Sequence, residues 1–151
     1  MSDSRVVHLV DDEEAIRKSV GFVLSRAGYK VQPYGSGAEF LMQARAAPRG
    51  CVLLDVRMPE MDGLQVQAAM ADRGIDMPVI VLTGHGDVTI AVQAMKAGAV
   101  EFLEKPFEKA ALLAALERAF LRLERNDNRE LEQREALTRI AALTPREREI
   151  L

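Results

Sequence analysis

The chain has 151 residues, of which 48% are hydrophobic and 28% charged, and its formal net charge is −3. This composition is typical of a globular domain and excludes disordered and fibrous proteins, and the slight acidic balance gives no basic footprint for nucleic acid. A single cysteine, Cys51, excludes an internal disulfide and a multi-cysteine metal site, and we expect it to be a small core residue. The apolar runs are too short to cross a membrane and the first residues lack a signal-peptide pattern, so we expect a cytoplasmic protein without membrane contact.

Short apolar runs rich in β-branched residues alternate with helical patterns along most of the chain. The first run, Val-Val-His-Leu-Val, is typical of a buried strand, and the helical pattern after it places apolar residues on one face. We expect Ser36 to cap the second helix, with Glu39 completing a capping box, and Asp87 to cap the fourth. The predicted strands are residues 6–10, 29–34, 51–54, 78–82 and 99–103, and the predicted helices are residues 13–27, 37–46, 62–73 and 87–96, with a fifth from 108 onward.

This (βα)₅ alternation predicts an α/β fold. Strands joined through helices by short connections form a parallel sheet that is doubly wound, with helices on both faces. We therefore expect a five-stranded parallel sheet of the flavodoxin-like type. In such sheets ligands bind at the carboxyl ends of the strands, near the point where the strand order reverses.

The last helix extends past the expected end of the domain. An apolar stripe from Leu112 to Leu123 is interrupted at Asn126-Asp127-Asn128 and resumes at looser spacing. From Leu121 to Leu151 the chain has seven Arg and seven Asp or Glu, so this tail is charge-balanced. Residues 126–142 are interpreted as a solvated helical linker or a weak coiled coil, and an exposed helix without a partner is the alternative.

Polar side chains follow the apolar strands where each of four strands ends. They are the pair Asp11-Asp12, then Asp55, Thr83 and Lys105. Because the carboxyl ends of parallel strands share one rim of the sheet, we expect three carboxylates, a hydroxyl and an ammonium group to meet there. Such a rim can hold a divalent cation and accept a phosphoryl group.

Adjacent carboxylates repel each other, so Asp11 and Asp12 beside Asp55 require a cation. Hard oxygen ligands select Mg²⁺ or Mn²⁺. We expect Asp12 and Asp55 as direct ligands, Asp11 through a water molecule, and the backbone carbonyl of Arg57 as a further oxygen. The alternative is that the acids only favour the N-terminus of the following helix.

A carboxylate such as Asp55 can act as a nucleophile and form an aspartyl-phosphate. Lys105 would neutralise one phosphoryl oxygen and Thr83 would donate a hydrogen bond to another. Dinucleotide and P-loop glycine motifs are absent. His8 and His85 lack metal-ligand partners and are interpreted as structural.

At these residues the chain resembles a two-component response regulator receiver domain, over residues 5–125. The resemblance rests on Val10-Asp11-Asp12-Glu13, the run Asp-Val-Arg-Met-Pro-Glu-Met-Asp-Gly from Asp55, Leu82-Thr83-Gly84 and Glu104-Lys105-Pro106-Phe107. The resemblance is strongest to the FixJ-like subgroup. It rests there on Thr83-Gly84-His85-Gly86-Asp87 and on the segments 94–99 and 101–107.

The resemblance implies roles for individual residues. Asp55 corresponds to the phosphoacceptor of a partner histidine kinase, Asp11 and Asp12 to the acids that bind Mg²⁺, and Thr83 with Phe102 to the switch pair. Phosphorylation would turn the face formed by the fourth helix, fifth strand and fifth helix toward homodimerisation. Val92 and Lys96 are the candidates for that face.

Residues 143–151, Leu-Thr-Pro-Arg-Glu-Arg-Glu-Ile-Leu, are similar to the opening of a LuxR-type helix-turn-helix domain. We therefore expect a receiver domain over 1–125, a linker over 126–142 and an incomplete DNA-binding domain from 143. Specific DNA binding would need the missing part. A fragment of a transcription regulator is preferred, and a natural short form is the alternative.

Two other functions remain open. One is a Mg²⁺-dependent hydrolase with an aspartyl nucleophile, similar to haloacid dehalogenase-type phosphatases, but Arg57 stands where those enzymes carry an acid. The other is an interaction module that is never phosphorylated. We expect a phosphoacceptor signalling domain whose only catalysis is its own phosphoryl transfer, rather than an enzyme.

Overall fold

The computed structural model describes residues 5–84 and 86–142, with side chains described to residue 129. Its five strands are β1 (Val6–Val10), β2 (Lys30–Tyr34), β3 (Gly50–Asp55), β4 (Val79–Thr83) and β5 (Glu101–Glu104). Its five helices are α1 (Glu14–Arg26), α2 (Gly37–Gln43), α3 (Gly63–Asp72), α4 (Val88–Lys96) and α5 (Lys109–Ala142).

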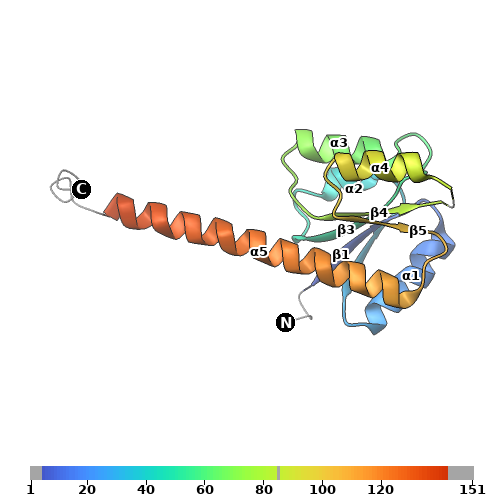
Figure 1. Cartoon of the computed structure of the whole chain (residues 1–151), viewed down its shortest axis with the longest axis horizontal. Helices are drawn as coiled ribbons and strands as arrows, with labels where there is room; N and C mark the ends of the chain where they lie inside the picture. Colours follow the sequence, from blue (N-terminus) through green and yellow to red (C-terminus); the bar gives the residue numbers. More distant parts are fainter. Residues whose placement is uncertain (1–4, 85, 143–151) are drawn as a thin grey trace.

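The strands form one parallel sheet in the order β2-β1-β3-β4-β5. Helices α2, α3 and α4 lie over one face of the sheet, and α1 and α5 cover the other (Figure 1). The doubly wound prediction is therefore confirmed. The strand order reverses between β1 and β3, so the rim of the sheet at the ends of these two strands is the expected ligand site.

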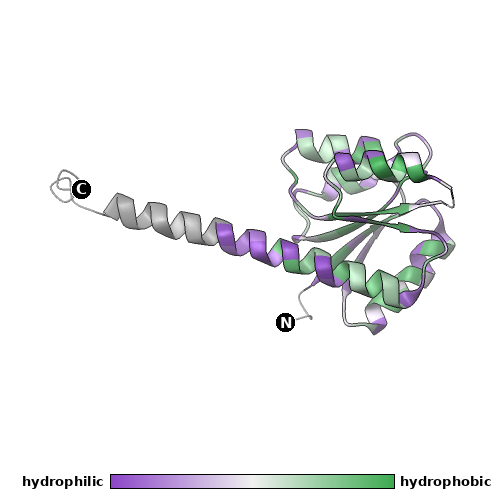
Figure 2. Cartoon of the chain, viewed as in Figure 1, coloured by the Kyte–Doolittle hydropathy of each residue, from purple (hydrophilic) through white to green (hydrophobic). Residues whose placement is uncertain are grey.

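The core consists of two apolar layers separated by the sheet. Successive residues of a strand point to opposite faces, so Leu54 and Val81 pack under α2, α3 and α4, while Leu53 and Leu82 pack against α1 and α5. Strands β1, β3 and β4 are buried along their whole length, and the sheet is accordingly hydrophobic in Figure 2. Cys51 is buried in this core, as predicted.

Helix α5 is the longest element, with 34 residues. Leu112, Leu116 and Phe120 bury its inner face, and Arg5 lies 2.9 Å from Glu117 and 3.1 Å from Glu124. The helix continues through residues 126–128, where the apolar stripe is interrupted and Asp127 pairs with Arg49 at 2.8 Å. Beyond this pair it projects from the body on the side opposite the strand carboxyl ends (Figure 1). No helix in the described part of the chain is long and apolar enough to span a membrane.

Local hydrogen bonds confirm one predicted helix cap and contradict another. The Ser36 hydroxyl accepts the Glu39 N–H as predicted, although the Glu39 carboxylate accepts the N–H of Gly35 and α2 ends at Gln43 rather than 46. The predicted capping by Asp87 is wrong, because its side chain makes no bond to its own helix. The Asp87 carboxylate instead accepts hydrogen bonds from Arg57, which lies 30 residues earlier in the chain.

His8 is buried inside β1. Its Nε2 lies 2.8 Å from the Pro48 carbonyl and its Nδ1 lies 3.1 Å from the Tyr34 hydroxyl. These contacts agree with a structural histidine. His85 lies outside the described residues.

Gly63 lets α3 begin directly against the end of β3. A Cβ atom at this position would lie 2.8 Å from the Asp55 carbonyl oxygen and 2.9 Å from the Val56 Cα, and the Gly63 N–H donates to the Val56 carbonyl at 2.9 Å. Both clashing atoms belong to the backbone, so no side-chain rotation relieves them. Asp62 and Gln65 complete a reciprocal capping box beside it, which sequence reasoning missed.

We expect Gly63→Ala to lower the free energy of unfolding by about 1–3 kcal/mol, because the new methyl group overpacks against the β3 backbone. Gly21→Ala is the matched control, since its Cβ would meet only Val31 at 3.9 Å, and an alanine inside α1 should stabilise the protein by about 0.5–1 kcal/mol. Urea denaturation measures both changes. Equal effects of the two substitutions would contradict the packing argument.

Candidate functional site

Four functional side chains meet where the strands end. Asp11 follows β1, Asp55 is the last residue of β3, Thr83 is the last residue of β4, and Lys105 follows β5. The backbone holds these ends together, since the Asp11 N–H donates to Tyr34 at 3.2 Å and the Lys105 N–H donates to Thr83 at 2.7 Å. The parallel register therefore places residues from four separate segments on one rim.

The Lys105 ammonium group lies between two carboxylates. Its Nζ is 3.1 Å from Asp11 Oδ2 and 3.6 Å from Asp55 Oδ2. The following peptide bond, Lys105-Pro106, is cis. Asp11 is fully buried and Asp55 nearly so, while Lys105 is partly exposed at the mouth of the site.

The charged groups at the rim are buried and close together, so their pKa values are shifted. Burial and then the neighbouring Asp11 charge raise the pKa of Asp55 to about 6, against the opposing effect of Lys105. Burial alone would lower the pKa of Lys105, but Asp55 and Asp11 outweigh it and raise that pKa. The site thus has more negative charge than its single ammonium group neutralises.

The acidic cluster fits a divalent cation. One oxygen from each of Asp11, Asp12 and Asp55 lies within 4.8 Å of the others, and Asp12 is exposed to solvent. Asp11 Oδ1 accepts the Glu13 N–H at 3.0 Å. An all-oxygen donor set with surplus negative charge suits Mg²⁺ better than a softer metal.

The predicted switch residues lie beside this rim. Thr83 is buried, and its hydroxyl donates to the Leu103 carbonyl at a long 3.4 Å. Phe102 is turned outward, with 43% of its surface exposed. Val92 is 46% exposed and Lys96 is also exposed on α4, together with Val88 and Met95, which the sequence reasoning did not single out.

Sequence reasoning did not predict one contact at the mouth of the site. Two nitrogens of the Arg57 guanidinium donate to Asp87, Nε at 2.7 Å and Nη2 at 2.6 Å. Arg57 follows Asp55 by two residues, and Asp87 follows Thr83 by four. Because β3 and β4 are neighbours, their positions after adjacent strand ends could have suggested the pair.

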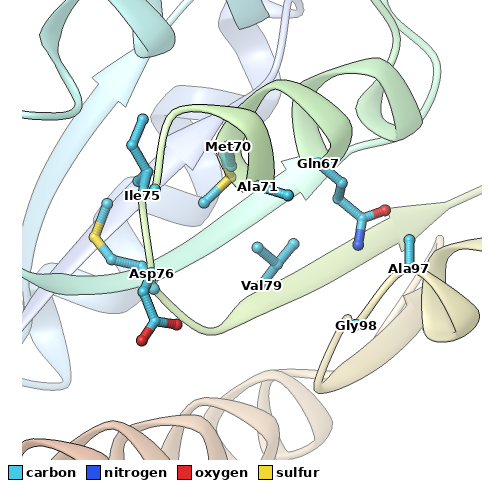
Figure 3. A pocket seen from close by; sticks show the side chains of 10 residues that line it. Gln67, Met70, Ala71, Ile75, Asp76, Val79, Ala97 and Gly98 are labelled. Carbon is cyan, nitrogen blue, oxygen red and sulfur yellow. The ribbon is translucent and has the colours of Figure 1, made fainter.

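Two pockets lie outside the acidic cluster. One of about 360 Å³ lies between α1 and the start of α5, lined by Ile16, Val20 and Phe107, and Lys105 forms part of its wall. The other, of about 260 Å³, lies at the opposite end of β4, between the ends of α3 and α4. Figure 3 shows the Gln67 amide and the Asp76 carboxylate near opposite ends of this second pocket. Of these two pockets the first borders the rim, and a further pocket of about 340 Å³, lined by Val56, Arg57 and Ile90, lies beside the end of β3.

Comparison with known proteins agrees with this geometry. A family model described as the response regulator receiver domain matches residues 7–117. The chain belongs to the response regulator receiver family. It is a FixJ-like receiver domain of two-component signalling, with the fold of that family.

The similar proteins include transcription regulators. The chain is 44% identical over 151 residues to the transcriptional regulatory protein FixJ of Azorhizobium caulinodans, covering 100% of this chain and 72% of that protein. The solved structure of FixJ-N is 48% identical with a TM-score of 0.74, covering 76% of this chain and 92% of that one. The structure of the response regulator StyR is 38% identical with a TM-score of 0.86, covering 97% and 74%.

The raised pKa of Asp55 predicts a pH-dependent stability difference. The folded protein keeps this proton up to about pH 6, whereas the ordinary pKa of this carboxyl group is 3.8, so ionisation of Asp55 costs stability as the pH rises between these values. Asp55→Asn removes that cost. At about 1.4 kcal/mol for each pKa unit, discounted for solvent screening, we expect the variant's advantage to grow by about 1–2 kcal/mol from pH 4.5 to 7.5.

Urea denaturation with a metal chelator present measures this difference. Asp72→Asn, at the exposed end of α3, is the control and should show no such growth. A constant advantage of Asp55→Asn at both pH values would contradict the electrostatic assignment.

Proposed function

We propose that Asp55 accepts a phosphoryl group from a partner histidine kinase in a Mg²⁺-dependent reaction, and that this modification promotes homodimerisation through α4, β5 and α5. The observation that carries the proposal is the Lys105 ammonium group, 3.1 Å from Asp11 and 3.6 Å from Asp55. A nucleophilic carboxylate, a cation for the phosphoryl oxygens and a pair of further acids are the parts that phosphoryl transfer requires.

The proposed reaction transfers a phosphoryl group from a histidine of the donor to Asp55. An Asp55 carboxylate oxygen attacks phosphorus, and the bond between phosphorus and the donor's imidazole nitrogen breaks. The imidazole leaves with that electron pair and takes up a proton. Because the pKa of Asp55 is about 6, this carboxylate is mainly ionised at neutral pH and can act as the nucleophile. Lys105 would then neutralise a phosphoryl oxygen, and Thr83 would turn from Leu103 to donate to another.

Asp11, Asp12 and Asp55 would hold Mg²⁺, with the Arg57 carbonyl as a further oxygen. A bound Mg²⁺ ion neutralises negative charge that develops on the transferring group. Asp12 supports this assignment, since it is the exposed member of the cluster and can meet an ion that arrives from solvent. The Asp11 oxygen that accepts from Glu13 is oriented by that bond.

The apolar pocket between α1 and α5 is the proposed approach side of the kinase. It shares Lys105 with the acceptor site and is lined mainly by apolar side chains of two helices. A donor histidine must come within bonding distance of Asp55, so its protein has to contact a surface next to the rim. This pocket meets that requirement.

The output surface lies on α4 and β5. Val88, Val92 and Met95 are spaced at helical intervals and are exposed, and Phe102 of β5 is exposed as well. Movement of Thr83 toward a phosphoryl group would break its long bond to Leu103, beside Phe102, and so repack this surface. We propose that the dimer presents a LuxR-type domain to DNA, and that this exchange occurs in the cytoplasm.

Intact mass after incubation with acetyl phosphate and Mg²⁺ tests the acceptor. We expect one added phosphoryl group, lost in Asp55→Asn and in a chelator control, because the carboxylate and the metal act together. Lys105→Ala should reduce the yield by roughly 10-fold or more, as expected for removal of a charge that stabilises the transition state. Addition to Asp55→Asn would contradict the assignment.

A second prediction concerns the output surface. Val92→Glu should weaken dimerisation of the phosphorylated chain by roughly 10-fold or more, since a charge would be buried at the centre of an apolar contact. Its phosphorylation yield should not change. Met42→Glu is the matched control, because Met42 is 84% exposed on α2, away from α4. Sedimentation of both phosphorylated variants measures their dimer affinities. Equal affinities of the two variants would mean that the interface lies elsewhere.

A further inference from the structure

The Arg57–Asp87 ion pair joins two loops across the mouth of the acceptor site. Arg57 lies in the loop after β3 and Asp87 immediately precedes α4. Both guanidinium bonds are short, at 2.6 and 2.7 Å, which is the paired geometry that Arg and a carboxylate form most strongly. The pair therefore ties the start of α4 to the strand that carries Asp55.

The pair also takes Asp87 away from the position where aspartate ordinarily stabilises a helix. Asp87 occupies the N-cap of α4, yet its carboxylate makes no capping bond, and its backbone (φ −87°, ψ 48°) departs from the extended conformation of a usual cap. The Gly84 N–H and Arg57 hold the carboxylate instead. Helix α4 thus starts without the side-chain cap that its own sequence provides.

Arg57 also contacts the acceptor through its backbone, and after Asp87 the charge of Asp55 contributes to raising the pKa of its guanidinium. Its backbone N–H lies 3.3 Å from Asp55 Oδ1, and its side chain is 67% exposed, so among the described residues the ion pair with Asp87 is the contact that holds the guanidinium. A phosphoryl group adds nearly two negative charges and three acceptor oxygens. Arginine binds phosphate in the same paired geometry as it binds carboxylate, so a phosphoryl group on Asp55 competes with Asp87 for one cation.

We propose that the Arg57–Asp87 pair is a latch that holds α4 in the unphosphorylated arrangement and that phosphorylation of Asp55 releases it. The released Asp87 carboxylate then caps α4, whose outer face carries Val88, Val92 and Met95. This inference rests on the proposed phosphorylation of Asp55 and adds a second link from that residue to the dimer face, besides Thr83 and Phe102.

The size of the effect follows from the exposure of the pair. Exposed ion pairs contribute little, and a well-formed bidentate pair lies at the upper end of that range. Loss of the latch should therefore shift the equilibrium between the two α4 arrangements by roughly 3- to 10-fold. Such a change alters a signalling equilibrium without unfolding the domain.

Hydrogen exchange of the α4 amides in the chain without a phosphoryl donor tests the latch itself. Arg57→Ala should speed their exchange by roughly 3- to 10-fold. Asp87→Ala should speed exchange at least as much, because it removes both the ion pair and the carboxylate that could cap α4. In the double variant Arg57→Ala should add little to Asp87→Ala, because the partner of Arg57 is then absent. Lys18→Ala is the control, since it breaks the exposed Lys18–Glu14 pair on α1 and should leave α4 exchange unchanged. Unchanged exchange in Arg57→Ala, or additive single effects, would overturn the latch.

The same measurements after acetyl phosphate and Mg²⁺ test its release. We expect the coupling between Arg57 and Asp87 to disappear in molecules whose intact mass shows an added phosphoryl group. Coupling that persists in phosphorylated molecules would overturn release. Absence of the added mass would instead contradict the proposed function, and the exchange data from the unphosphorylated chain would still decide whether the latch exists.

Discussion

The contact of one ammonium group with two buried carboxylates is the interaction on which the rest of the structure depends. Asp11 and Asp55 are placed by strands that pair in parallel, and Lys105 reaches them from the end of a third strand. Burying an uncompensated carboxylate costs several kcal/mol, so the ammonium group makes this arrangement tolerable without neutralising it fully. The pKa of Asp55 is raised by burial and by Asp11, which shows that Lys105 does not fully compensate the negative charge. A site with such surplus negative charge favours binding of a cation.

Rigid and movable parts of the domain are separated by the kind of contact that holds them. Strands β1, β3 and β4 are packed on both faces by aliphatic side chains, which fixes the acceptor carboxylate within a dense core. The neighbours that would respond to it are held by weaker polar contacts. Thr83 makes a 3.4 Å hydrogen bond, and Arg57 binds Asp87 from an exposed position. A new charge can therefore rearrange these groups while the strand beneath them stays in place.

The sequence was sufficient for the sheet and the rim because both follow from short-range patterns. Apolar runs of strand length mark β1, β3 and β4, and the polar residue at the end of each run must lie on one edge of a parallel sheet. Sequence reasoning failed where a partner distant in the chain overrides a local preference. Asp87 has the residue type and position of a helix cap, but a guanidinium 30 residues away binds it. Asp127 pairs with Arg49, a contact between distant segments that no local pattern indicates. The position of Gly63 could be read as a turn, whereas its role in backbone packing needs three dimensions.

Helix α4 is the element in which these observations converge. It has nine residues, its side-chain cap is engaged elsewhere, and part of its apolar surface faces solvent. Helices this short derive most of their stability from packing rather than from propensity, so an added cap or a lost ion pair can change the position of α4 without unfolding the domain. A two-state element responds to a ligand only as far as the ligand distinguishes its two states. A phosphoryl group that draws on both Thr83 and Arg57 would distinguish them through two independent contacts, so neither contact alone needs to supply the whole free energy of switching.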